Sequence, residues 1–313
     1  MTMIDTNYIK CKYCGELNEA AYIKSTTTFD GPNLDLRPAP LASGLFVYSC
    51  YYCKKCNYSY LMHSNINNMD IKTNIDSEEY QNVIKTVSNE YLRRFLLAAL
   101  NHKYIKDYRN AAYSYLYASW IFDDKCNNDL YNDNPYRLMA AKQFLELEDI
   151  TIKELLITID LLRRNCYFEK ALETLELFFK KDNIKPEEKN IANIQKELIE
   201  LKNNYNFRTT DFIRTKESDY TPLDKVKKIL SSKNIKKEII LKGNRSFPIK
   251  GIPKYVLNLN LKKYLILSND EDNLFAFEFV EGKKIFCLKQ IDNKDDFDEI
   301  IKKYSEVISN NGS

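Results

Sequence analysis

Apolar residues recur every three or four positions through the middle of the chain, which is the spacing of one face of an α-helix. A clear example consists of Phe168, Ala171, Leu172, Leu175, Phe178 and Phe179. Stripes of this kind predict helices near residues 78–102, 107–122, 135–147, 151–165, 168–181 and 186–205. Pro135 and Pro186 fall at expected first-turn positions, where the missing N–H of proline breaks no helical hydrogen bond.

The pattern changes in the last third of the chain, where short apolar runs are typical of β-strands. Leu274–Val280 and Lys284–Gln290 flank Glu281 and Gly282, so we expect a β-hairpin with a two-residue turn. Further strands are expected at Glu238–Lys242, Tyr255–Asn260 and Tyr264–Ser268. A closing helix that covers the sheet is predicted by the stripe Phe297, Ile300, Ile301, Tyr304, Val307 and Ile308.

The placement of glycine divides the chain into three segments. The sequence has 7 glycines and none of them lies between Leu45 and Lys242. Because glycine serves turns and weakens helix interiors, this gap indicates helices that are joined by short polar loops. We therefore expect a Cys-rich zinc-ribbon-like domain over residues 1–75, a helical-hairpin domain over 76–218 and a small α+β domain over 219–313.

Two joints between the predicted helices share one pattern. Tyr108 precedes Ala111, and Phe168 precedes Ala171, by three positions in each case. In tetratricopeptide-type hairpins, a small alanine allows close approach of two helices and an aromatic residue fills the end of the hairpin. The alanines lie 60 positions apart (171 minus 111), which is no multiple of the 34-residue repeat, so the array should be irregular. An ordinary amphipathic helical bundle is the alternative.

Composition narrows the classes of function. The chain has 47 basic and 44 acidic residues, and a net charge of +3 argues against a general polyanion binder. With 7 glycines and 2 histidines, neither a Gly-rich phosphate loop nor histidine-based catalysis is expected. The apolar runs of the sequence include neither a membrane span nor the apolar core of a secretory signal, so we expect a cytoplasmic protein with no membrane partner.

Two Cys-x2-Cys motifs carry the candidate chemistry. In such a knuckle the backbone turns tightly, both sulfurs converge on one ion, and the N–H groups of the turn point at the thiolates. Gly15 and Asn57 follow the two pairs, and both residue types tolerate the left-handed conformation that such a turn needs. Four thiolates form the closed tetrahedral set of a structural Zn²⁺. The expected ligands are Cys11, Cys14, Cys53 and Cys56. A redox pair or reduced surface cysteines are the alternatives.

Cys50 leaves the second knuckle open, because Cys50 and Cys53 are also separated by two residues. We favour Cys53 and Cys56 because Asn57 fits the end of the turn, which leaves Cys50 as a packed thiol or a spare ligand. His63 is expected to be a surface histidine. Four sulfurs leave no open position for water, so the zinc should be structural and not hydrolytic.

Several charged residues have structural interpretations. The segment between the two Cys-x2-Cys motifs is long enough to contain an inserted loop, which includes Arg37. Arg37 is expected to pair with Asp35 or Asp30 and to hold this loop over the ribbon, with a partner contact as the alternative. Asp123 and Asp124 are adjacent at a predicted helix end, where we expect solvating charges and not a general acid and base.

Two features favour nucleic acid as a possible partner. The segment 225–242 is rich in lysine above a short apolar stripe, although a solvated amphipathic helix leading into a strand is the simpler interpretation. Tyrosines near the ribbon are suited to stack on bases or to form strands. They are Tyr48, Tyr51, Tyr52, Tyr58 and Tyr60.

Five motifs of the N-terminal two thirds occur together. They are Cys11-x2-Cys14-Gly15, Asp35-Leu36-Arg37-Pro38-Ala39-Pro40, Cys53-x2-Cys56-Asn57-Tyr58, Asp107-Tyr108-Arg109-Asn110-Ala111-Ala112 with Trp120, and Leu161-Leu162-Arg163-Arg164 with Phe168-Glu169-Lys170-Ala171. On these motifs the chain resembles a bacterial family of uncharacterised proteins with a zinc ribbon followed by tetratricopeptide-like helices. It departs at Asn57, where glycine is common, and in the extra Cys50.

The family resemblance implies metal binding and protein interaction, and it implies no enzymatic activity. The C-terminal segment also resembles a second small bacterial domain of unknown function, an antiparallel sheet with a C-terminal helix. Lys263–Ser268 and Asp292–Tyr304 carry this second resemblance.

We therefore expect a multidomain α+β protein: a zinc ribbon, an irregular helical-hairpin array, and a small antiparallel sheet with a covering helix. The expected function is that of a non-enzymatic adaptor, in which a structural Zn²⁺ stabilises the ribbon and the helical array offers a groove for a protein or peptide. The alternative is a nucleic-acid-associated regulator that uses the ribbon and residues 225–242. A zinc hydrolase would need an open coordination position.

Overall fold

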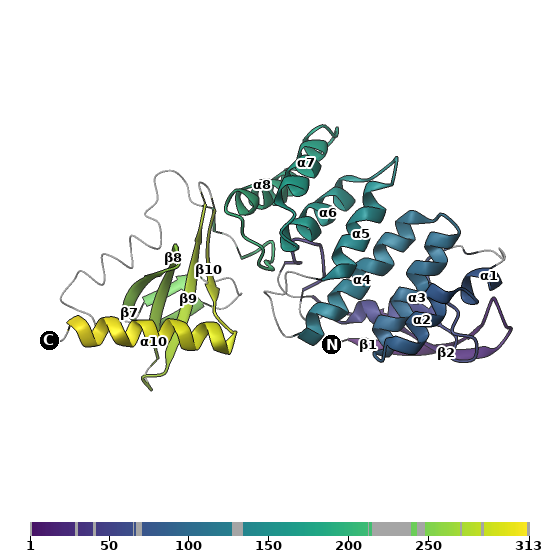
Figure 1. Cartoon of the computed structure of the whole chain (residues 1–313), viewed down its shortest axis with the longest axis horizontal. Helices are drawn as coiled ribbons and strands as arrows, with labels where there is room; N and C mark the ends of the chain where they lie inside the picture. Colours follow the sequence, from purple (N-terminus) through teal and green to yellow (C-terminus); the bar gives the residue numbers. More distant parts are fainter. Residues whose placement is uncertain are drawn as a thin grey trace. The chain divides into compact units, whose positions relative to one another are not determined.

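The structure, a computed structural model, divides into two compact units, Met1–Asn206 and Phe207–Ser313. Figure 1 shows helices and a hairpin in the first unit, and a sheet and a long helix in the described part of the second. The described residues are 2–28, 31–39, 42–64, 66, 71–126, 134–211, 213–214, 239–242, 248–269, 271–282 and 285–311. Residues 225–238 of the basic segment, together with Asp30, lie outside them.

The first unit begins with two antiparallel hairpins, and each turns through one Cys-x2-Cys motif. Strands β1 (Met3–Lys10) and β2 (Leu17–Ser25) form the long hairpin, and β3 (Cys50–Tyr52) and β4 (Ser59–Leu61) form the short one. A 3₁₀ helix, η1 (Leu45–Ser49), leads into β3. Each turn is closed by the pairing of its own two strands, and β2 also contacts η1, the helix that leads into the short hairpin.

A series of helices follows, and each helix from α3 onward packs against the next one along the chain. The helices are α1 (Lys72–Ile75), α2 (Glu78–Thr86), α3 (Glu90–Tyr104), α4 (Tyr108–Cys126), α5 (Pro135–Leu145), α6 (Ile152–Arg164), α7 (Phe168–Phe179) and α8 (Pro186–Glu200). Ala111 and Ala171, the small residues of the two similar joints, are both fully buried. The helical content expected from the sequence is confirmed.

The single helix expected over residues 78–102 is wrong, because the structure has two helices there. Val87 is extended (φ −91°, ψ 100°), which ends α2. The side chain of Asn89 then accepts a hydrogen bond from the backbone N–H of Leu92, so Asn89 caps a new helix. The apolar stripe continues across the break because both helices turn their apolar faces to the same core.

Left-handed residues end three of these helices. Lys106, Cys166 and Lys202 have φ values of 61°, 63° and 49°. In each case the next N–H bonds to a carbonyl five positions back, which is the Schellman motif. The helical segment thus lacks glycine although it contains positions of the kind that glycine usually fills.

In the second unit, the described strands form an antiparallel sheet in the order β5-β10-β9-β8-β7-β6. The strands are β5 (Ile213–Arg214), β6 (Ile239–Lys242), β7 (Pro248–Leu259), β8 (Lys262–Ser268), β9 (Leu274–Glu281) and β10 (Ile285–Gln290). The expected pairing of the last two strands is confirmed. The two-residue turn is wrong, because Glu281 pairs with Phe286 and the connection is longer.

The expected closing helix is present as α10 (Lys294–Asn311). The side chain of Asn293 caps its first turn by accepting from the backbone N–H groups of Asp295 and Asp296. Most of the predicted apolar stripe packs on the sheet, but Ile308 is exposed. Its members in the core are Phe297, Ile300, Ile301, Tyr304 and Val307.

Candidate metal centre

The turns of the two N-terminal hairpins bring four cysteine sulfurs together. The Sγ atoms of Cys11, Cys14, Cys53 and Cys56 all lie within 4.8 Å of one another. The Sγ atoms of Cys11 and Cys56 are 3.7 Å apart, and those of Cys14 and Cys53 are 3.6 Å apart. Sulfurs bound at about 2.3 Å to one tetrahedral zinc ion would be about 3.8 Å apart. The cluster therefore fits a single metal ion with four sulfur ligands.

Each pair of cysteines sits in the same kind of backbone turn. The N–H of Gly15 donates to the carbonyl of Cys11 (3.0 Å), and the N–H of Asn57 donates to the carbonyl of Cys53 (2.8 Å). Gly15 and Asn57 have φ values of 75° and 59°. The left-handed conformation predicted at both positions is confirmed, and it explains why glycine and asparagine stand there.

Backbone N–H groups point at the buried sulfurs. Burial raises the pKa of the Cys53 thiol, but the N–H groups of Cys56 and Lys55 donate to its sulfur, and the net effect lowers the pKa to about 7. Burial also raises the pKa values of Cys11 and Cys56, and at these two thiols it prevails over the backbone hydrogen bonds. Four clustered thiolates repel one another, so a divalent cation among them would stabilise the charged form.

Cys50 lies apart from the cluster and is a packed thiol. Its Sγ contacts the hydroxyl of Ser59 (3.2 Å) and the backbone carbonyl of Arg94 (3.7 Å). Burial raises the pKa of this thiol to about 12, so it stays protonated at neutral pH. Of the two registers that the sequence left open, the one with Cys53 and Cys56 matches the geometry.

Asn18, on β2, is a supporting residue that the sequence analysis missed. Its amide donates to the Sγ of Cys53 (3.5 Å) and to the hydroxyl of Tyr51 (3.1 Å), and its carbonyl oxygen accepts from the N–H of Lys54 (3.3 Å). Asn18 thereby connects the long hairpin to the second knuckle. Contacts of this kind orient metal ligands, but a lone asparagine in a strand gives no signal in a sequence.

Most of the tyrosines near the cysteine cluster are buried beside it. Tyr51, Tyr58 and Tyr60 are at most 5% exposed, so they are not available to stack on bases. Tyr48 and Tyr52 are half-buried. Tyr80, from α2, donates its hydroxyl to the carbonyl of Asn57 (2.8 Å) and so fixes the second knuckle to the helices.

Neither histidine belongs to the cluster. His63 is exposed, as expected, and its Nε2 lies 3.1 Å from the Oδ1 of Asn110. His102 is fully buried; its Nε2 accepts from the N–H of Leu61 and its Nδ1 donates to Asp107. His102 is therefore a structural residue that connects β4 to the helices.

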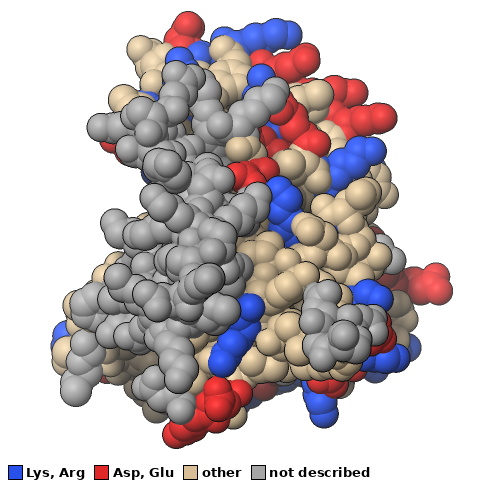
Figure 2. Space-filling model, turned by 90° about the vertical axis from the view of Figure 1, so that its left-hand side faces the viewer, with Lys and Arg blue, Asp and Glu red and all other residues tan. Residues whose placement is uncertain are grey.

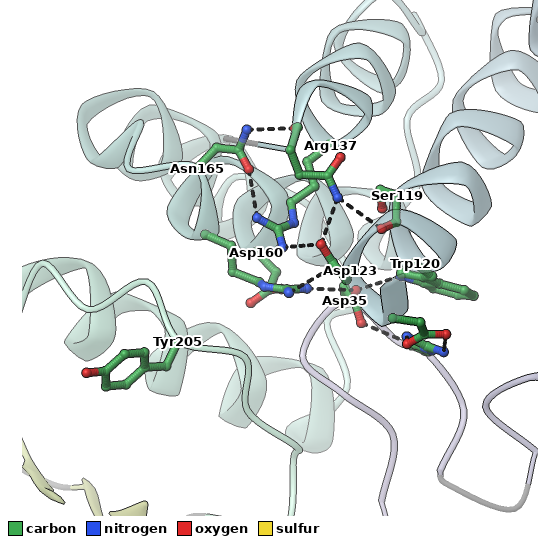
Figure 3. A network of polar contacts seen from close by, with 12 residues as sticks. Asp35, Ser119, Trp120, Asp123, Arg137, Asp160, Asn165 and Tyr205 are labelled. Atoms are coloured by element: carbon green, nitrogen blue, oxygen red, sulfur yellow. Dashed lines mark hydrogen bonds and ion pairs between the residues drawn. The ribbon is translucent and has the colours of Figure 1, made fainter. Parts of the chain in front are cut away.

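The ion pair expected for Arg37 is wrong, because its side chain instead joins the inserted loop to the helical array. Its guanidinium makes two hydrogen bonds to Asp124, at 2.8 and 2.6 Å. Asp35 accepts from the indole N–H of Trp120 (2.7 Å), and its Oδ2 lies 3.5 Å from Arg164. Figure 3 shows Asp35 beside Trp120 and Asp123. The loop is therefore fixed to helices far along the chain.

Asp123 was expected to be a solvating charge at a helix end, and this prediction is also wrong. Its carboxylate accepts from Arg137 (2.6 Å), Arg164 (2.8 Å) and Asn134 (2.7 Å), all three of which are buried (Figure 3). Burial raises the pKa of Asp123, but the two guanidinium groups outweigh it and lower the pKa. Asp123 is therefore the centre of a buried ion-pair network.

Comparison of the chain with protein-family models, with curated proteins and with solved structures finds no match. Of the helices in the described ranges, none has the length and apolarity needed to cross a membrane. On the face drawn in Figure 2, the described Lys and Arg side chains are interspersed with Asp and Glu and form no continuous basic area.

Proposed function

We propose that this chain is a non-enzymatic, zinc-binding interaction protein. Four cysteine sulfurs that lie within 4.8 Å of one another carry the proposal. Because a set of four thiolates closes the coordination sphere, the ion has no position for a reacting water. The zinc would hold the long hairpin against the rest of the first unit, and it would do so without chemistry of its own.

The helical array is the proposed binding surface for a protein or peptide partner. Successively packed helices present extended surfaces that many repeat proteins use for binding. On α7, Leu172 and Phe179 are exposed although they are large and apolar. This surface, and the family resemblance stated for the N-terminal two thirds, support an adaptor role.

Partner capture with matched variants tests the adaptor proposal. The full chain and a Leu172→Glu/Phe179→Glu variant would be used to recover partners from the same extract. We expect proteins that bind the parent chain and are lost with the variant, while a Glu169→Ala/Lys170→Ala variant on the same helix retains them. Recovery of identical sets, together with turnover of a substrate by the purified chain, would remove the proposal.

The nucleic-acid alternative has less support. Three of the five tyrosines that would stack on bases are buried in the ribbon. Binding to single-stranded nucleic acid that weakens steeply with salt would revive this alternative. Absence of binding at low salt would eliminate it.

A further inference from the structure

The long N-terminal hairpin has one open edge. Strand β1 pairs only with β2 among the described residues, while β2 also contacts η1. Two-stranded hairpins are marginally stable in water, and an exposed strand edge is a template for pairing. On this hairpin Met3, Ile4 and Tyr8 are 52%, 47% and 67% exposed. An exposed apolar strand with a free edge is therefore a site where a further strand can pair.

Hydrogen bonds identify the residues that point toward the open edge. The N–H of Cys11 donates to the carbonyl of Glu16 (2.7 Å), which continues the β1–β2 ladder at an odd-numbered position. The N–H groups of Thr6 and Tyr8 instead donate to the side chains of the residues before them, at 2.9 Å each. Even-numbered residues of β1 therefore direct their backbone groups away from β2.

We propose that two copies of this chain associate through β1, in an antiparallel pair whose two-fold axis passes through Thr6. The result is a four-stranded sheet in the order β2-β1-β1-β2. In this register Thr6 faces Thr6 of the second copy, and Ile4 faces Tyr8. On the other face Met3 lies opposite Ile9, and Asp5 lies opposite Asn7. Every apolar residue thus meets an apolar residue, and no like charges face each other.

The neighbouring registers are less favourable. In an antiparallel pair, a residue whose backbone groups point toward the partner strand lies opposite another residue of that kind. In β1 these are the even-numbered residues, so an even-numbered residue faces an even-numbered one and the two-fold axis passes through a residue, not between two residues. An axis at Asp5 places two aspartates opposite each other, which is destabilising. An axis at Asn7 places Asp5 opposite Ile9 and Ile4 opposite Lys10. The sequence of β1 is therefore self-complementary about Thr6.

Pairing replaces the hydrogen bonds between the N–H groups of β1 and neighbouring side chains with hydrogen bonds between backbones. The side chains of Asp5 and Asn7 release the N–H groups of Thr6 and Tyr8, which then donate to the second copy. On one face Ile23 of β2 lies beside Ile4, because the two are direct partners in the hairpin. Ile23, Ile4 and Tyr8 of the second copy would form one apolar row across the new sheet. The interface is small, so we expect reversible, micromolar association.

Two double variants test the register. In Ile4→Lys/Tyr8→Lys, like charges face each other twice across the dimer. In Ile4→Glu/Tyr8→Lys, opposite charges face each other twice, and the variants differ only at position 4. Tyr8→Lys is suited to both because its hairpin partner is Glu19. Analytical ultracentrifugation should show dimers of the parent chain and of the Glu/Lys variant at about 100 µM, and dissociation about tenfold or more easier for the Lys/Lys variant.

A backbone variant gives an independent test. Thr6→Pro removes an N–H that does not bond to β2, so the hairpin should persist while the dimer is lost. Zinc content and circular dichroism of every variant would show whether the first unit remains folded. A monomeric parent chain at about 100 µM, or equal association of the two double variants, would overturn the proposal. Neither outcome depends on the adaptor role.

Discussion

At the scale of single residues, the two cysteines Cys50 and Cys53 have opposite roles although they are close in sequence. Cys53 lies in the cluster of four sulfurs, whereas Cys50 contacts Ser59 and a backbone carbonyl. We predict that Cys53→Ser abolishes stoichiometric zinc binding and that Cys50→Ser retains it. Elemental analysis of the two purified variants measures this. Loss of zinc from Cys50→Ser alone would contradict the assignment.

Asp107 gives a pH-dependent prediction. Burial raises the pKa of its carboxyl, but hydrogen bonds from His102 and Asn110 prevail and lower the pKa to about 2. A carboxyl with a depressed folded-state pKa stabilises the fold above its unfolded pKa of about 3.9, and this contribution disappears as the pH falls toward 2. The stability advantage of the parent chain over Asp107→Asn should therefore be full at pH 6 and shrink below about pH 4.

Denaturant unfolding of both proteins at several pH values measures this difference. Loss of zinc in acid affects both chains equally and cancels in the comparison. An advantage that stays constant from pH 6 to pH 3 would show that the Asp107 carboxylate is not stabilised by the fold.

At the scale of helices and strands, the joints between helices carry backbone strain that glycine would relieve. Lys106 and Cys166 adopt left-handed conformations that are unfavourable for residues with a Cβ atom. We predict that Lys106→Gly and Cys166→Gly each stabilise the protein by about 0.5–1 kcal/mol, since the gain exceeds the entropic cost of glycine. Thermal unfolding measures the change.

Lys103 is the matched control for this prediction. It is an exposed lysine within α3, three positions before Lys106, and it has helical conformation. Lys103→Gly should destabilise the protein by about 1 kcal/mol. If all three glycine variants were destabilised alike, strain at the joints would not be the cause.

How well the elements were predicted depended on how local their signals are. The Cys-x2-Cys pairs with Gly15 and Asn57 encode each knuckle within a few positions, so both the turns and the cluster of four cysteines were predictable. The break between α2 and α3 was missed because the cap at Asn89 competes with an uninterrupted apolar stripe. The long β1–β2 hairpin was also not predicted in detail, because its strands are exposed and show little alternation in burial.

At the scale of the whole molecule, the first unit is held together by contacts that no local pattern reveals. Arg37 bonds to Asp124, 87 positions away. The sequence shows that a charged loop exists, but the partner is determined only when α4 packs beside that loop. The buried pairs of Asp123 were missed for the same reason, because adjacent acidic residues at a helix end usually face water.

Asp123 and Asp124 provide a direct comparison of buried and exposed ion pairs. The side chain of Asp123 is 13% exposed and that of Asp124 is 54% exposed. Asp123→Ala removes the carboxylate that accepts from two buried guanidinium groups, so we expect a loss of about 3–5 kcal/mol in the free energy of unfolding. Asp124→Ala should cost only about 1 kcal/mol or less. Equal losses in denaturant titrations would contradict the network.

X-ray absorption at the zinc edge, combined with metal content, tests the metal centre most directly. The account predicts one zinc ion per chain, surrounded by four sulfur atoms at about 2.3 Å. Nitrogen or oxygen atoms among the ligands, or a fully folded chain with reduced cysteines and no bound zinc, would contradict it.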